Sequence, residues 1–133
     1  TAQKQIIVFN MQIVLLIGLG GFFGTIARYL IGNAFTQYSK PNFPFATLTV
    51  NLLGCFIIGL IYGWFEKQQL NSSDWKLILT AGFCGGFTTF SAFSIENIQM
   101  MRDGQTLMAI LYIFSSLLFG LLLTWLGMSL TRT

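Results

Sequence analysis

The sequence predicts an all-α membrane protein with four transmembrane helices, from its composition and from the long stretches that carry no charge. Hydrophobic residues make up 54% of the 133 residues, charged residues make up only 8%, and histidine is absent. Soluble domains carry about 25% charged residues, so this chain has too little charge to cover a surface that faces water. High apolar content and a low net charge also exclude intrinsic disorder. We expect no enzyme, because the usual acid and base groups are scarce.

Four runs of residues without charge define the expected spans. They contain 23, 25, 19 and 28 residues and occupy positions 5–27, 41–65, 77–95 and 104–131. A spanning helix needs about 20 mostly apolar residues, so each run predicts one span. Little sequence remains between them, which predicts a single four-helix membrane domain over residues 1–133. The basic residues are scattered through the loops, a pattern that fits the lipid bilayer better than nucleic acid.

The basic residues divide almost evenly between the two sides of the membrane. Four spans place Lys4, Lys67, Lys76 and Arg132 on one side and Arg28, Lys40 and Arg102 on the other. Orientation normally follows the side with more Lys and Arg, and here the excess is a single charge. Two interpretations stay open: a weak bias corrected by other signals, or dual topology with an antiparallel homodimer. Small size favours dual topology, because four short helices leave little room to enclose a pathway alone.

The first two spans carry small and polar residues at helical spacing. Gly20 and Gly24 have the spacing of a close helix contact. Arg28 continues that face, either as an arginine that snorkels to the interface or as a group that draws anions into a vestibule. Asn51 lies near the middle of the second run, one turn after Thr47. A buried amide must be paired or face water, so Asn51 either forms an interhelical hydrogen bond or lines a pathway.

The third run combines glycines with hydroxyl-bearing residues. Gly82, Gly85 and Gly86 precede Thr88, Thr89, Ser91 and Ser94, which predicts a helix break near Gly85–Thr89. Backbone groups freed by a break are tolerated in a bilayer only where they face protein, water or an ion, and broken helices often hold ions near the midplane. Phe90 and Phe93 follow at a spacing of three residues. Their positive ring edges, with nearby hydroxyls, suit a small anion, although two packed core rings give the same pattern.

The fourth run repeats small and polar residues at every fourth position. The series is Tyr112, Ser116, Gly120 and Thr124. Such a stripe is typical of helix contacts, and it equally fits a narrow polar track.

Together these segments resemble the Fluc (CrcB) family of fluoride channels, in all four spans and in order. The residues that carry the resemblance are Gly20, Gly21, Gly24, Arg28, Tyr29, Thr47, Val50, Asn51, Gly54, Phe56, Gly59 and the stretch GGFTTFSAFS at positions 85–94. Two residues depart from the family pattern. Ala92 stands where threonine is more frequent, and Ala46 stands where glycine is common.

The resemblance implies an antiparallel homodimer with two pores that exports fluoride passively from a bacterial cytoplasm across the inner membrane. It also implies a structural sodium ion at the dimer centre, held by backbone carbonyls at positions that match Gly85 and Thr88. The family's pore positions match Asn51, Phe90 and Phe93. We expect the fluoride pathway to include these three residues together with Thr47, Thr89, Ser91, Tyr112 and Ser116, and Arg28 to lie in an anion vestibule.

The alternative function is a small dual-topology, proton-coupled multidrug antiporter. That chemistry needs a carboxylate inside the membrane, and the only candidate is Glu96, near the end of the third run. A structural subunit without transport activity would not explain an amide at mid-membrane beside the predicted break.

Overall fold

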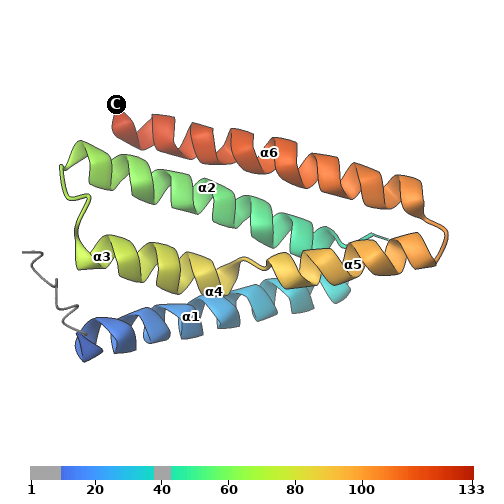
Figure 1. Ribbon diagram of the computed structural model, residues 1–133, viewed down its shortest axis with the longest axis horizontal. Helices are drawn as coiled ribbons and strands as arrows, with labels where there is room; N and C mark the ends of the chain where they lie inside the picture. Colours follow the sequence, from blue (N-terminus) through green and yellow to red (C-terminus); the bar gives the residue numbers. More distant parts are fainter. Residues whose placement is uncertain (1–9, 38–42) are drawn as a thin grey trace, which may run out of the picture.

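The described residues, 10–37 and 43–133 of a computed structural model, form four helices long and apolar enough to cross a membrane (Figure 1). These spans are Met11–Thr36, Phe45–Lys67, Asp74–Arg102 and Thr106–Arg132. The predicted all-helical architecture with four spans is therefore confirmed. The charge count also used Lys4 and Lys40, which lie outside the described residues.

Local sequence signals explain where the helices begin. Helix α1 (Met11–Thr36) starts after Asn10, whose side chain accepts a 3.1 Å hydrogen bond from the Gln12 N–H. Helix α2 (Phe45–Lys67) starts after Pro44, whose fixed φ suits a helix start. The turn before α6 (Thr106–Arg132) contains Gly104 at φ 78°, a conformation that glycine adopts without a steric cost.

The third span is divided into four helical pieces and one interruption. It contains α3 (Asp74–Leu77), the π-helical segment η1 (Ile78–Cys84), α4 (Gly85–Phe87) and α5 (Phe90–Arg102). Between α4 and α5, Thr88 and Thr89 are extended, with ψ angles of 159° and 114°. The break predicted near Gly85–Thr89 is confirmed. Its glycines lie in the helical turn before the break, and the extended residues are the two threonines.

Glycines allow neighbouring helices to approach each other closely. A Cβ atom at Gly24 of α1 would collide with the backbone of Phe83, and one at Gly86 of α4 would collide with Gly21. Gly59 of α2 similarly faces the backbone of α6 at Thr124. Such contacts bring α1 against the first half of the third span and α2 against α6, as the arrangement in Figure 1 shows.

The two ends of the bundle carry different groups. Lys67, Lys76 and Arg132 lie at the end where α2 and α6 finish, and Arg102 lies at the opposite end (Figure 1).

The outer faces of the helices are apolar: Leu121 and Phe114 of α6 are 72% and 68% exposed. In a membrane these faces contact lipid or another protein chain, and the break lies midway between the two ends.

Candidate functional site

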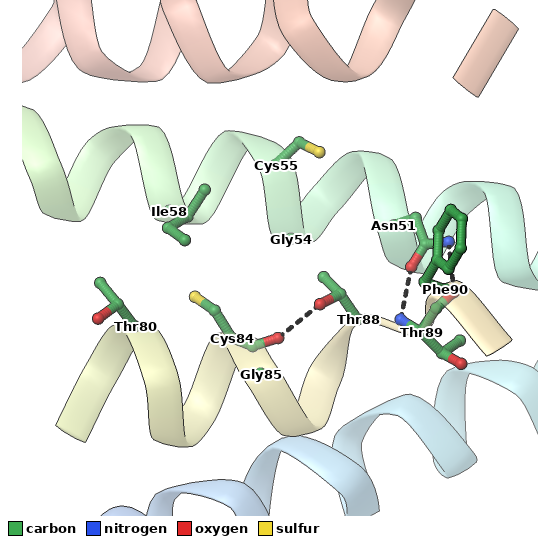
Figure 2. Close-up of a pocket in the computed structure, with 10 residues that line it drawn as sticks. All are labelled: Asn51, Gly54, Cys55, Ile58, Thr80, Cys84, Gly85, Thr88, Thr89 and Phe90. Carbon is green, nitrogen blue, oxygen red and sulfur yellow. Dashed lines mark hydrogen bonds between the residues drawn. The ribbon is translucent and has the colours of Figure 1, made fainter. Parts of the chain in front are cut away.

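Asn51 of α2 holds the broken segment of the third span. The Thr89 N–H donates to Asn51 Oδ1 at 2.8 Å, and Asn51 Nδ2 donates to the Thr89 carbonyl at 3.0 Å (Figure 2). Both backbone groups of one extended residue are therefore paired by one side chain. The interhelical hydrogen bond considered for Asn51 is present. A primary amide has two N–H donors, so one donor remains for a further partner.

Threonine side chains form hydrogen bonds at the helix end on each side of the break. Thr88 donates both its N–H and its hydroxyl to the Cys84 carbonyl, at 2.9 and 2.8 Å. The hydroxyl oxygen of Thr89 accepts a 3.2 Å hydrogen bond from the Ala92 N–H and so caps α5. The sequence Thr-Thr thus ends one helix and begins the next, which explains why the break falls at these two residues.

Several backbone carbonyls at the break lack their helical donors, and those of Gly85 and Thr88 are among them. In an unbroken α-helix the Gly85 carbonyl would accept from the Thr89 N–H, and the Thr88 carbonyl from the Ala92 N–H. Those N–H groups donate instead to Asn51 and to the Thr89 hydroxyl. The carbonyls of Gly85 and Thr88 are the pair expected to hold sodium. Oxygen atoms are the ligands that hard cations take, so the donor set fits such an ion.

A hollow of about 330 Å³ lies along this segment, between α2 and the third span (Figure 2). At one end it is lined by Ile58 and Thr80, and at the other by Asn51, Thr89 and Phe90. Phe90 lies at the edge of the hollow and is 77% exposed. The hollow is open on one side, so polar backbone near the middle of the bundle is not fully covered by this chain.

A second polar cluster surrounds Glu96 of α5. Thr47 donates its hydroxyl to Glu96 Oε1 at 2.6 Å, and Tyr112 donates its hydroxyl to Oε2 at 2.8 Å. Tyr112 has no exposed surface, and Glu96 is half-buried. Side chains from α2, α5 and α6 therefore meet at one carboxylate. Charge-assisted hydrogen bonds of this kind are about twice as strong as neutral ones.

Aromatic rings connect the break to this cluster. The ring centroids of Phe90 and Phe93 are 5.6 Å apart, and those of Phe93 and Tyr112 are 5.0 Å apart at an interplanar angle of 60°. Near the break, the hydroxyls of Thr89 and Ser91 are 3.4 Å apart. One chain of contacts through Glu96 therefore links four residues predicted for the pathway: Thr47, Tyr112, Phe93 and Phe90. Hydrogen bonds at the break link three more: Asn51, Thr89 and Ser91.

Two predicted residues stand apart from that chain of contacts. Ser116, one turn beyond Tyr112 on α6, has a buried hydroxyl without a hydrogen-bond partner in the described part of the molecule. Arg28 is half-buried in the second half of α1. Within residues 10–37 and 43–133 the ion pair found is Arg132–Glu66, at 3.2 Å, so Arg28 is not charge-paired there.

The family profile described as "CrcB-like protein, Camphor Resistance (CrcB)" matches residues 15–128. The chain belongs to the CrcB family. A CrcB relative from Flavobacterium psychrophilum is 44% identical over 122 residues, which cover 92% of this chain and 98% of the relative. A relative from Chlorobaculum tepidum is 48% identical over 92% of this chain and 96% of its own length. A third, from Pseudomonas fluorescens, is 41% identical over 90% of this chain and 96% of its own length. Each relative is named "Fluoride-specific ion channel FluC".

Sequence reasoning underestimated Glu96 in this CrcB chain. It was considered only as a carboxylate for an antiporter, placed near the end of the third run. In the structure it lies in the middle of α5 and joins Thr47 to Tyr112. Glu96 follows Phe93 by three residues, which puts both on one helix face. This spacing is the sequence signal that could have placed Glu96 beside the predicted pathway.

Replacing Asn51 with leucine should destabilise the protein strongly. Leucine has a similar size but leaves the N–H and carbonyl of Thr89 unpaired, and each unsatisfied buried group costs about 1–3 kcal/mol. We expect a clearly lower melting temperature in detergent, measured by the loss of the folded peak in size-exclusion chromatography. The control is Asn33→Leu, which removes an exposed amide from α1. Equal melting temperatures for the two variants would contradict the role of Asn51.

Proposed function

We propose that this chain forms a fluoride-selective channel that lets fluoride leave the cytoplasm passively. The observation that carries the proposal is 41–48% identity, over at least 90% of the chain, to the three relatives named as fluoride-specific ion channels. Four apolar spans make the protein a multi-pass membrane protein, which in a bacterium belongs in the inner membrane. The proposed pathway consists of Asn51, Phe90 and Phe93 with the hydroxyls of Thr47, Thr89, Ser91, Tyr112 and Ser116, and Arg28 attracts anions at its vestibule.

The pathway must replace the water that fluoride loses. Hydrogen-bond donors are supplied by the second N–H of Asn51 and by the Ser116 hydroxyl, which has no partner among residues 10–37 and 43–133. The edges of Phe90 and Phe93 supply weaker positive contacts without a fixed charge. Conduction needs sites that bind the ion and also release it, which favours such contacts over a lysine or arginine. The hydroxyls of Thr47 and Tyr112 donate to Glu96, so they reach fluoride only when the Glu96 side chain moves away.

The direct test is anion release from liposomes that contain the purified protein, with valinomycin to balance the charge. We expect rapid fluoride release and no chloride release under the same potassium gradient. Release of neither anion would contradict the proposed function. Release that requires a proton gradient would favour the antiporter.

Isoleucine at position 90 or 93 should reduce fluoride release while folding and assembly persist. Isoleucine keeps the apolar bulk but removes the ring edge. Losing one aromatic contact should lower the rate of fluoride release by a factor of about 2 to 10. Methionine, which is flexible and polarizable, should reduce release less. The matched control is Phe114→Ile, on the exposed face of α6. If both pathway variants matched that control, the rings would be packing residues only.

The assembly that fits this pathway is an antiparallel homodimer with two pores. The carbonyls of Gly85 and Thr88 lack helical donors, and they border a hollow that is open on one side. Backbone of this kind is not tolerated against lipid, so a second copy is the cover we propose. The near-equal charge of the two sides allows that copy to insert in the opposite orientation.

Three lysines added to one predicted loop should force every chain into one orientation. Antiparallel pairs could then no longer form, and fluoride release should be lost. Orientation is measured by labelling a single exposed cysteine from one side of intact vesicles. Full fluoride release by a variant with one uniform orientation would contradict the antiparallel dimer.

A structural sodium ion at the dimer centre is proposed to bind the carbonyls of Gly85 and Thr88. Its support is that these two carbonyls are among those that lose their helical donors and that both residues line the hollow. The melting temperature should be higher in sodium than in N-methylglucamine at equal ionic strength. Thr88→Val keeps the carbonyl, so the dependence on sodium should persist in that variant. Identical melting in both salts would contradict a structural sodium ion.

A further inference from the structure

The aromatic chain of contacts continues beyond the proposed pathway to Phe43, a residue that has no assigned role. The ring centroids of Phe43 and Tyr112 are 5.4 Å apart, with an interplanar angle of 69°. Phe43 precedes α2 and lies at the end of the bundle where α5 passes into α6. Tyr112 therefore lies between two rings, Phe93 on one side and Phe43 on the other.

The orientation of the Tyr112 ring depends on these two neighbours. Its hydroxyl is held by Glu96 at 2.8 Å, which fixes the position of the oxygen. Rotation of the ring about its long axis leaves that oxygen in place, so the hydrogen bond does not set the ring plane. The edge contacts with Phe43 and Phe93 do set it, because edge-to-face pairs prefer a defined angle.

Phe43 is itself held firmly enough to act on its neighbour. Pro44 restricts the residue before it to extended conformations, and the Phe45 N–H donates to the Phe43 carbonyl at 2.9 Å. The half-buried Phe43 side chain packs against the buried cluster of Met100, Ala109 and Tyr112. A fixed backbone and a packed ring give Phe43 a single position beside Tyr112.

We propose that Phe43 is a positioning residue for ion conduction: it sets the plane of the Tyr112 ring and, through that ring, the plane of Phe93. The inference rests on the proposed channel function, because it concerns the same pathway. Phe43 does not touch the ion in this account. It fixes which part of Tyr112 and Phe93 faces the pathway.

The flux test compares Phe43→Leu with Phe43→Tyr, which keeps the ring, and with Phe114→Leu. Phe114 is 68% exposed on the outer face of α6. The protein is reconstituted into liposomes at high dilution. Under this condition the fluoride release rate of each active channel can be measured separately from the fraction of channels that are active. Phe43→Leu should lower the rate per channel by about two- to tenfold, the value of one aromatic pair, and leave the active fraction unchanged. Phe43→Tyr and Phe114→Leu should conduct like the wild type.

A coupling test asks whether Phe43 acts through Tyr112. In a Tyr112→Leu background, Phe43→Leu should cause no further loss of rate per channel. An equal additional loss would overturn the inference, and so would a normal rate per channel in Phe43→Leu alone. A loss of active fraction with an unchanged rate per channel would mean that Phe43 serves folding only.

A readout without fluoride separates this inference from the channel function. The chain has four tyrosines, so ring-labelled tyrosine gives a simple NMR spectrum in which Tyr112 can be assigned by substitution. Phe43→Leu should shift the Tyr112 ring signals and speed its ring flips, whereas Phe114→Leu should not. Unchanged Tyr112 signals in Phe43→Leu would overturn the inference, even if the wild type released no fluoride.

Discussion

The two hydrogen bonds between Asn51 and the backbone of Thr89 are the contact on which the rest of the site depends. A transmembrane helix cannot leave an N–H and a carbonyl unpaired in hydrocarbon. Asn51 supplies one acceptor and one donor at the required position, with distances of 2.8 and 3.0 Å. Thr89 can therefore be extended with its N–H and its carbonyl both paired, while the carbonyls of Gly85 and Thr88 are left without helical donors.

The geometry of the pathway follows from that break. Because the chain is extended for two residues, α5 starts anew at Phe90, and Phe93 and Glu96 face α2 and α6. The same bonds take the N–H of Thr89 away from the carbonyl of Gly85. A single amide on α2 thus accounts for two features: the direction of the aromatic and acidic side chains, and the carbonyls that are free to bind a cation.

Patterns within one helix could be predicted from the sequence, whereas the partner residues on other helices mostly could not. The charge-free runs predicted four spans, and the glycine and threonine content predicted the break. Glu96 was undervalued because its partners, Thr47 and Tyr112, are 49 and 16 residues away. Phe43 was missed for the same reason, since its contact with Tyr112 crosses from the start of α2 to α6.

The extended backbone at Thr88 and Thr89 is the feature most directly open to measurement within the membrane. Solid-state NMR of the protein in lipid bilayers tests it, because Cα and Cβ chemical shifts report the backbone conformation of each residue. We expect shifts typical of extended backbone at Thr88 and Thr89, between helical shifts at Gly86 and at Ala92. Helical shifts at both threonines would contradict it.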